Sequence, residues 1–242
     1  MSTLQQPDLD FASVVHVTTC HPKWTRLQDD EPLALLHSKF WGKSLIFEES
    51  PGCISQPQSP HGDDVQRMDV DNNDNDIIPG PSILNIGIDR LPFPKIFIRA
   101  DYIRIYDFLN HLEIIRFPNG LAPAAVLTGH LGTGKFHLSM QQAERCTHLC
   151  MTRQVKSVWV SYAICWCLVD RKVTIWYCDH TCYLFVREGI FEAPPNFPSS
   201  YFRTFIWTLV DSDESKEGVP SQLMTPGTQL YVTYVTSPGG RE

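Results

Sequence analysis

The sequence predicts an α/β protein, namely an incomplete three-layer sandwich with a mainly parallel sheet, preceded by a disordered acidic linker. Two observations lead to this fold class. From residue 83 onward, short runs of β-branched and aromatic residues alternate with helical patterns, which is typical of a layered sheet. One of these runs leads into a glycine-rich turn at residues 129–135, which is typical of the phosphate-binding turns of such sheets.

Composition restricts the class of protein and its partners. The chain has 242 residues, of which 43% are hydrophobic and 19% charged, enough apolar material for a core. The net charge of -7 argues against nucleic acid or an anionic membrane as partner, because both require a surplus of Lys and Arg. The longest apolar run, residues 158–169, is shorter than the roughly 20 residues of a spanning helix. The first residues show no secretory pattern, so we expect an intracellular protein of the cytoplasm or nucleus.

Three segments differ in their residue pattern. Residues 1–48 are weakly patterned, apart from a short helix expected at residues 31–40, whose apolar side carries Leu33, Leu36 and Phe40. Residues 49–82 combine prolines with many aspartates and asparagines, which indicates a flexible acidic linker; a docking segment for a basic protein partner is the alternative. Residues 83–242 are expected to form the folded domain.

Apolar spacing predicts the elements of this domain in order. A short apolar segment at residues 95–98 precedes a helix expected at 101–115, where Asp101 suits the N-cap position. A buried strand follows at residues 124–128. An apolar helix is then expected at residues 158–169. The remaining strands are expected at residues 173–177, 183–186, 204–210 and 229–235.

Residues 129–135 read GHLGTGK and fit the Walker A pattern G-x-x-x-x-G-K after a strand. Glycines at these positions let backbone N–H groups surround a phosphate. The glycines concerned are Gly129, Gly132 and Gly134. Lys135 would reach the β- and γ-phosphates of a nucleotide. The next position should supply a hydroxyl ligand for Mg²⁺, but it is Phe136, which cannot coordinate a cation.

A serine that completes the pattern stands further along the chain. Ser157 directly precedes the apolar helix, and removing residues 136–156 joins it to Lys135. We therefore hypothesise that residues 136–156 are an insertion, such as a translated intron. The alternative is that residues 136–149 form the helix of the loop itself, with an inward side made of Phe136, Met140, Ala143 and Cys146.

An acidic residue that could orient a metal ion ends a later strand. Residues 204–211 form an apolar run that ends in Asp211, as a Walker B strand does, and a Mg²⁺ contact is the role expected there. Hydrolysis also needs a general base, but position 212 is serine. Glu214 is the remaining candidate, and a solvated loop acid is the simpler interpretation. The catalytic residues therefore stay unknown, and the sequence supports nucleotide binding better than hydrolysis.

The cysteines could alternatively act as metal ligands. Eight cysteines without a secretory signal are expected to be reduced thiols. Two C-x-x-x-C segments, each with a histidine in the middle, could hold zinc: Cys146, His148 and Cys150, and Cys178, His180 and Cys182. The second of them spans an expected hairpin turn, and the spacing differs from that of zinc ribbons, so we expect no zinc.

Several stretches together resemble one protein family. They are residues 96–103 (IFIRADYI), the loop 129–135, the strands at 173–177 and 183–186, residues 207–212 (WTLVDS) and residues 235–238 (VTSP). In order and spacing they look like the P-loop module of fungal Crinkler-type and retrotransposon-hot-spot proteins, over roughly residues 92–240. The resemblance implies a P-loop NTPase domain similar to the AAA and signal-transduction ATPases, which bind ATP or GTP with Mg²⁺.

The resemblance also implies roles for individual residues. Gly129, Gly132, Gly134 and Lys135 would hold phosphate, Ser157 would bind Mg²⁺ if it followed Lys135 directly, and Asp211 would make the second metal contact. The sequence departs from the family at Phe136, and we expect the C-terminal part of the module, with its fifth strand, helical lid and arginine finger, to be missing. The alternative function is therefore a degenerate, non-catalytic P-loop remnant that acts as a protein-interaction module.

Overall fold

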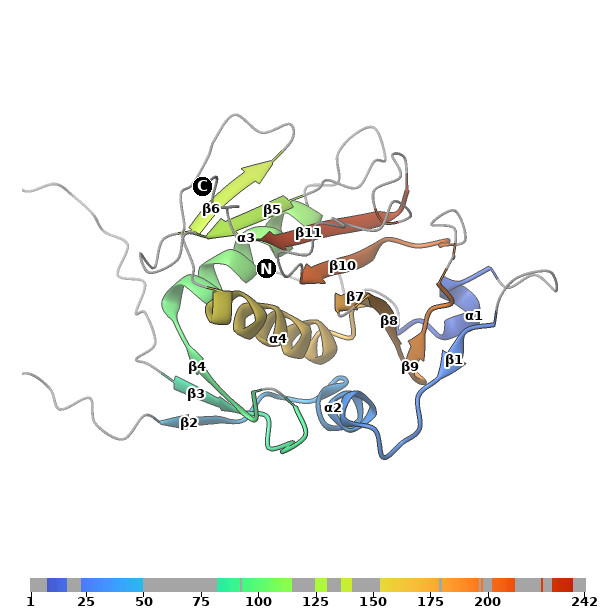
Figure 1. Ribbon diagram of the computed structural model, residues 1–242, viewed down its shortest axis with the longest axis horizontal. Helices are drawn as coiled ribbons and strands as arrows, with labels where there is room; N and C mark the ends of the chain where they lie inside the picture. Colours follow the sequence, from blue (N-terminus) through green and yellow to red (C-terminus); the bar gives the residue numbers. More distant parts are fainter. Residues whose placement is uncertain are drawn as a thin grey trace, which may run out of the picture.

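The computed structural model describes a mixed α/β protein in which long helices cover one face of a large sheet (Figure 1). The described residues are 8–16, 23–49, 82–91, 93–114, 125–129, 136–140, 153–178, 180–195, 197, 202–211, 223 and 228–236. The expected acidic linker at residues 49–82 falls almost entirely outside them. Within these ranges, none of the helices has the length and apolar content needed to cross a bilayer.

The large sheet has eight strands in the order β1-β9-β8-β7-β10-β11-β5-β6. Their bounds are Thr25–Arg26 (β1), Ala125–Gly129 (β5), Phe136–Met140 (β6), Thr174–Cys178 (β7), Thr181–Val186 (β8), Gly189–Glu192 (β9), Ile206–Asp211 (β10) and Leu230–Thr236 (β11). The four central strands β7, β10, β11 and β5 are parallel, and all other pairings are antiparallel. The sheet is therefore mixed, whereas the sequence led us to expect a mainly parallel one.

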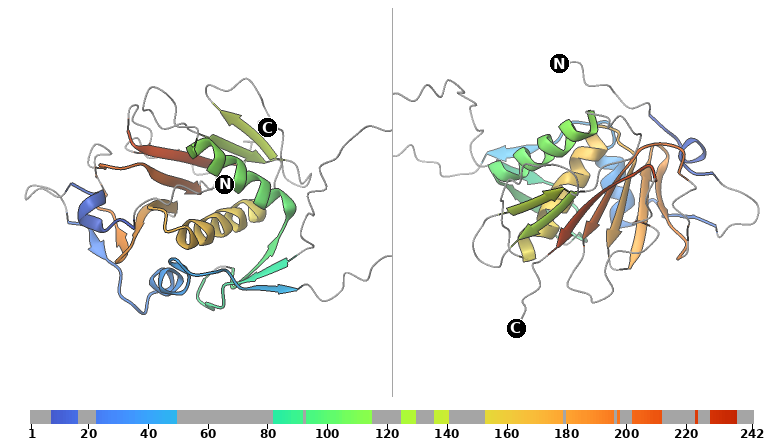
Figure 2. Two further views of the ribbon diagram at one scale, coloured as in Figure 1. Left: turned by 180° about the vertical axis from the view of Figure 1, so that it is seen from behind. Right: turned by 90° about the horizontal axis from the view of Figure 1, so that it is seen from above.

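Three helices lie on one face of this sheet: α2 (Pro32–Phe40), α3 (Ala100–Ile114) and α4 (Arg153–Val169). Figure 2 shows α3 and α4 side by side across the strands. Among the described residues, the opposite face is covered by the short helix α1 (Phe11–Val14) and by side chains of irregular segments, including Phe197, Phe202 and Leu223. In the described part of the chain, the expected three-layer arrangement therefore has a full helical layer on one face of the sheet and irregular segments on the other.

Both faces of the central strands are buried, which explains their continuous apolar runs. Along β10, residues 206–210 are all buried and alternate between two cores. Trp207 and Leu209 face the helices, where they join Tyr162 and Tyr231, while Ile206 and Val210 join the core on the opposite face. This alternation fixes the register of the sheet, because a slip by one residue would move each side chain to the other face.

A second, three-stranded sheet packs beside the helices. It consists of β2 (Phe47–Glu49), β3 (Ser82–Asn85) and β4 (Lys95–Ile98) in the order β2-β3-β4, and β4 confirms the apolar segment expected there. Leu84 and Ile96 pair across the strands and belong to the same core as α3 and α4. On the outer face, Phe97 is 53% exposed, and Glu48 accepts a hydrogen bond from Lys95 at 2.9 Å.

The N-terminal segment is more structured than its weak pattern suggests. The expected helix is present as α2, and its residues Leu36 and Phe40 are buried. In addition, β1 pairs with β9, so that Arg26 lies opposite Phe191 at the margin of the large sheet. A four-residue helix and a two-residue strand are too short to show a periodic signal, which is why sequence patterning does not reveal them.

Two further elements start at other positions than expected. Helix α3 begins at Ala100, so Asp101 lies in its first turn instead of capping it, and its carboxylate is 3.6 Å from the guanidinium of Arg99. Helix α4 begins at Arg153, before the apolar run that predicts it. The residues that extend these helices, Ala100 in α3 and the mostly polar residues 153–157 in α4, add nothing to the hydrophobic periodicity.

A buried histidine in α2 predicts a pH dependence of stability. The Nε2–H group of His37 donates to the carbonyl oxygen of Val186 at 2.7 Å, and burial lowers the pKa of His37 below its ordinary value of 6.5. In the unfolded chain this pKa returns to its ordinary value, so the unfolded state takes up the proton first. We therefore expect the free energy of unfolding to be highest above pH 6.5 and to fall as the pH drops below that value.

Urea unfolding between about pH 7.5 and about pH 5.5 measures this dependence. The matched variant His37→Gln keeps a hydrogen-bond donor but cannot titrate, so its unfolding free energy should change less across this range. An equally steep pH profile in both proteins would assign the dependence to other groups.

Candidate functional site

The candidate site lies at the edge of the large sheet where the parallel strands end. Since β7, β10, β11 and β5 run in the same direction, their carboxyl ends share one edge, which is where α/β sheets bind ligands. Asp211 ends β10 and pairs with Val235 of β11, and the next residue of β11, Thr236, pairs with Thr128 of β5. Asp211 is therefore in register with Val235 and Leu127, and Thr236 and Gly129 follow one and two positions further along their strands at this edge.

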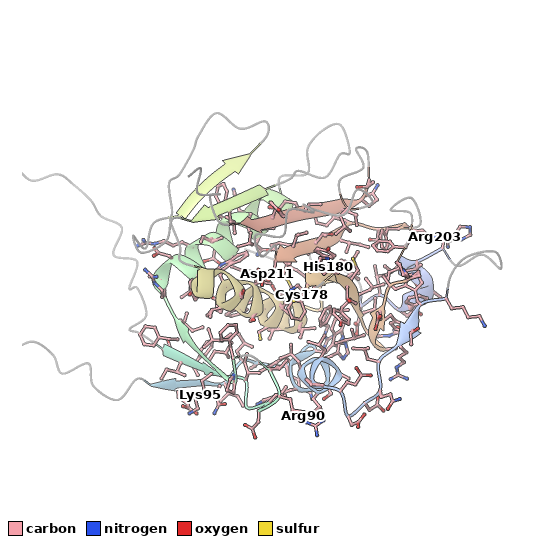
Figure 3. The ribbon with its side chains drawn as sticks, in the orientation of Figure 1. Arg90, Lys95, Cys178, His180, Arg203 and Asp211 are labelled. Carbon is pink, nitrogen blue, oxygen red and sulfur yellow. The ribbon has the colours of Figure 1, made fainter. Side chains whose placement is uncertain are left out.

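Strand alternation also sets the face on which these residues lie. Asp211 follows Leu209 by two positions, and Leu209 faces the helices. Gly129 stands in the same relation to Leu127, which belongs to the same core. Figure 3 shows Asp211 with Cys178 and His180, which belong to the neighbouring end of β7 and the turn after it. The acid and the first glycine of the Walker A pattern thus share both an edge and a face.

Helix α4 begins at this same edge. In Figure 1 its first turn lies on the side to which the arrowheads of β10 and β11 point, and its last turn leads into the start of β7. Ser157 is half-buried and lies one turn inside the helix, where its backbone carbonyl accepts a hydrogen bond from the hydroxyl of Ser161 at 2.8 Å. The structure therefore brings Gly129, Ser157 and Asp211 to one edge of the sheet.

The other predicted site residues lie outside the described residues. These are Gly132, Gly134, Lys135 and Glu214. The residue after Lys135 is described, and it begins a strand: Phe136 opens β6 and pairs with Gly129. The alternative in which residues 136–149 form a helix is therefore wrong for residues 136–140. An unpaired edge of β5 would leave backbone N–H and C=O groups without partners, and pairing with β6 satisfies them.

The expected hairpin between β7 and β8 is confirmed. Cys178 pairs with Thr181, and Tyr177 with Cys182, so the two cysteines belong to opposite faces of the hairpin. Burial raises the pKa of the Cys182 thiol to about 12, which keeps it protonated near neutral pH, whereas metal binding needs the thiolate. In the described part of the chain, no three His, Cys, Asp or Glu side chains are grouped to hold a metal ion. Cys146, His148 and Cys150 lie outside that part.

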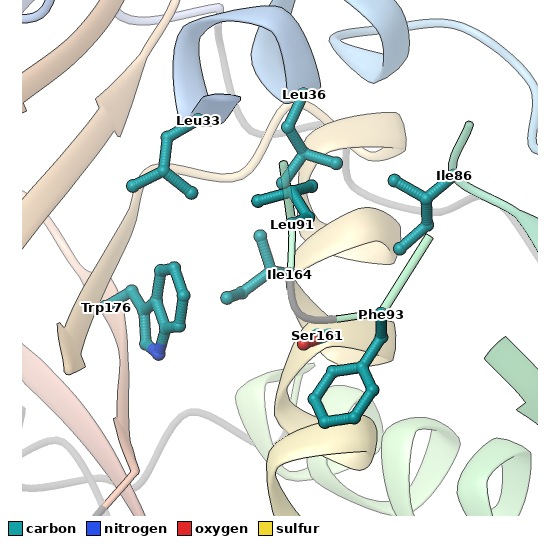
Figure 4. Close-up of a pocket in the computed structure, with 8 residues that line it drawn as sticks. All are labelled: Leu33, Leu36, Ile86, Leu91, Phe93, Ser161, Ile164 and Trp176. Carbon is teal, nitrogen blue, oxygen red and sulfur yellow. The ribbon is translucent and has the colours of Figure 1, made fainter. Parts of the chain in front are cut away.

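A small apolar cavity lies away from the sheet edge. It has a volume of about 20 Å³ and lies between α2, the connection from β3 to β4, helix α4 and Trp176 (Figure 4). Ser161 is the polar exception among the residues lining it, and its hydroxyl already donates to Ser157. Ligand sites usually combine an apolar lining with several polar groups that orient the ligand. Because Ser161 is the polar exception here, we do not regard this cavity as a candidate ligand site.

Buried polar groups that the sequence does not reveal lie on the helical face of the sheet. Lys172 is buried, its Nζ lies 4.4 Å from the ring centroid of Trp207, and it donates a hydrogen bond to Asn110. The hydroxyl of Tyr106 donates to Asp170 at 2.9 Å. Because these residues surround the start of β7, at the edge opposite to the candidate site, we assign them to packing.

Comparison with known proteins finds no relative of this chain. No family model, no curated protein and no solved structure matches this chain. The resemblance to P-loop modules therefore rests on the motif residues and their spacing. The geometry of the sheet edge is independent of that resemblance, since it follows from strand direction and register.

Proposed function

We propose that this chain binds a nucleoside triphosphate, ATP or GTP, together with Mg²⁺ at the carboxyl edge of its parallel strands. The observation that carries the proposal is that Gly129 and Asp211 lie at the carboxyl edge of the parallel strands, where helix α4, which contains Ser157, begins. A glycine-rich turn, a hydroxyl and a carboxylate are the groups that a P-loop uses for phosphate and metal.

The order of the strands supports the same function. The resemblance implies that the strand before the glycine-rich turn and the strand that ends in Asp211 belong to one parallel sheet. Here β11 lies between β5 and β10, and it ends at Thr236 beside Thr128. Helix α4 connects this region to β7, as the helix after a phosphate loop does.

The proposal is limited to binding. Lys135 would neutralise phosphate charge, and Asp211 and Ser157 would hold Mg²⁺, which supplies electrostatic stabilisation of the phosphates. Hydrolysis needs a group that orients water, and Ser212 takes the position after Asp211 where the larger branch of these enzymes has glutamate. We therefore assign no catalytic role to Glu214.

Titration with a fluorescent ATP analogue, with and without Mg²⁺, tests the proposal. We expect Mg²⁺-dependent binding that Lys135→Ala and Asp211→Asn each weaken roughly tenfold or more, because each removes a charged contact. Lys95→Ala is the matched control. Lys95 is an exposed lysine on the small sheet, paired with Glu48, and its removal should leave binding unchanged (Figure 3). Equal binding by Lys135→Ala and Lys95→Ala would contradict the proposal.

The second candidate function, a degenerate P-loop remnant that contacts other proteins, has one observation in its favour. Phe136 begins a strand where a working phosphate loop needs the start of a helix. The small sheet also exposes apolar side chains, with Phe47 at 45% and Phe97 at 53%. If neither the chain nor any of its variants binds the nucleotide analogue, this candidate replaces the first.

A further inference from the structure

A larger cavity lies at the carboxyl edge of the sheet, between the hairpin of β7 and β8 and the segment that follows β9. Its volume is about 210 Å³. Strands β7 and β9 both end at this edge, because each of them runs antiparallel to β8. The residues that line the cavity include Tyr177, His180, Cys182, Pro194, Pro195 and Phe197. Cys182 and Phe197 belong to the core on the face opposite to helices α3 and α4, so the cavity lies on that face.

Packing and hydrogen bonding hold the walls of this cavity in place. Phe197 is 3% exposed, and its ring centroid lies 5.5 Å from that of Trp24 and 5.9 Å from that of Phe202. The N–H group of Ala193 donates to the carbonyl oxygen of Cys182 at 2.8 Å, which ties the segment after β9 to the hairpin. Two consecutive prolines follow, and their rings lock φ. The cavity is therefore preformed, which lowers the cost of binding a ligand in it.

Two side chains bring hydrogen-bonding groups to the cavity. The hydroxyl of Tyr177 and Nδ1 of His180 are 3.5 Å apart, which is long for a hydrogen bond, so a ligand can replace this contact. His180 lies in the tight turn at the end of the hairpin (Figure 3). Its φ of 65° is a conformation that side chains other than glycine adopt at a cost. A phenol and an imidazole each donate and accept, so they can bind both polar groups of one ligand.

The lining determines the chemical class of the ligand. None of the described residues that line the cavity is Lys, Arg, Asp or Glu, so a charged ligand would lose its hydration without meeting a fixed counter-charge. The aromatic rings of Tyr177 and Phe197 favour a flat partner, since rings attract one another in stacked and edge-on arrangements. A cavity of about 150 Å³ takes up one benzene ring, so this cavity has room for a somewhat larger ring system.

We propose that this cavity binds a neutral, planar nitrogen heterocycle of one or two rings, whose polar edge contacts Tyr177 and His180. The site goes beyond the proposed nucleotide site. It lies on the opposite face from Asp211, and it contains none of the residues assigned to phosphate or Mg²⁺. The two sites are nevertheless neighbours, because Tyr177 pairs with Val210, the residue before Asp211. The base of a nucleotide that reaches across the sheet edge and a separate heterocyclic metabolite share this chemistry.

Titration of the full chain with adenine, followed by saturation-transfer NMR, tests this inference. We expect binding that two variants each weaken roughly fivefold, as one lost hydrogen bond predicts. Tyr177→Phe removes the hydroxyl and keeps the ring. His180→Gly removes the imidazole and suits the φ of the turn, so the hairpin should be retained. The matched control is His111→Ala, which changes an exposed histidine of α3 and should leave binding unchanged.

Several results would overturn the inference. One is the absence of adenine binding up to the solubility limit of adenine, and another is equal affinity in the original chain, Tyr177→Phe and His180→Gly. Cyclohexanol is similar in size to one ring but is not planar, so it should bind more weakly than adenine. Equal binding of the two probes would exclude a site for planar heterocycles. Should circular dichroism show that His180→Gly is unfolded, Tyr177→Phe decides alone.

Competition with ATP and Mg²⁺ distinguishes the two sources of the heterocycle. If ATP displaces adenine and Tyr177→Phe also weakens the binding of ATP, the ligand is the base of the nucleotide. If adenine stays bound, the ligand is a separate heterocycle, and either result supports the site. Lys135→Ala tests the proposed function and should leave the binding of adenine itself unchanged. Failure of the nucleotide proposal can therefore be told apart from failure of this inference.

Discussion

Trp207→Ala is expected to lower the free energy of unfolding by about 3–5 kcal/mol, the range for a buried Trp or Phe cut back to alanine. Trp207 is 0% exposed at the centre of the large sheet. Its ring lies 5.2 Å from that of Tyr231 and 5.6 Å from that of Tyr106, and the Lys172 ammonium lies 4.4 Å from its centroid. Alanine would leave a cavity and also remove the aromatic face beside a buried cation.

Urea unfolding followed by circular dichroism measures this loss. Trp207→Phe serves as the control, because it keeps an aromatic face and most of the volume, and it should cost clearly less than the alanine variant. An alanine variant within roughly 1 kcal/mol of the original protein would show that β10 is not the centre of the core.

Leu84→Ala is expected to lower the free energy of unfolding by about 2–5 kcal/mol, although the residue belongs to the small sheet. Leu84 is 0% exposed and belongs to the same core as residues of α3 and α4. The small sheet and the large sheet should therefore unfold together, so that a cavity at Leu84 shifts one common transition.

Phe97→Ala is the matched control within that sheet. Phe97 lies on β4, pairs with Ile83 on the outer face and is 53% exposed, so its removal should change the unfolding free energy by only about 0.5 kcal/mol or less. Tryptophan fluorescence and far-ultraviolet circular dichroism should report the same midpoint for Leu84→Ala. Two separate midpoints would mean that the small sheet unfolds independently.

Elements with a strong local pattern could be predicted from the sequence. Helix α4 carries Trp159, Ala163 and Cys167 at four-residue steps, all of them buried. The apolar runs that become β10 and β11 are continuous because helices cover one face and other core residues cover the second. The hairpin of β7 and β8 was predictable because a short polar turn, with His180 at φ 65°, separates two apolar runs.

Pairings between distant segments could not be predicted in this way. Strand β1 has two residues and reaches β9 near the middle of the second half of the chain. Strand β6 reads FHLSM, a short run with no signal that distinguishes a strand from the first turns of a helix. Its position is decided by the free edge of β5, a tertiary feature.

The candidate site was likewise predictable from the sequence only in part. Gly129 and Asp211 could be singled out because each ends an apolar strand, and parallel direction then brings such ends together. Ser157 could be singled out because it precedes an apolar helix. That Phe136 begins a strand was not predictable, since the pattern G-x-x-x-x-G-K is local, whereas the pairing of β6 with β5 depends on which strand edge is available.

The pairing of β1 with β9 has a consequence for how the protein folds during its synthesis. Thr25 and Arg26 leave the ribosome long before Phe191 and Glu192 are translated, so the margin of the large sheet closes only after most of the chain has emerged. Nascent chains would expose the apolar side chains of their early segments throughout that interval, and chaperones recognise such surfaces. Strand β1 is thus synthesised well before β9 and reaches its final place in the sheet only after β9 has been made.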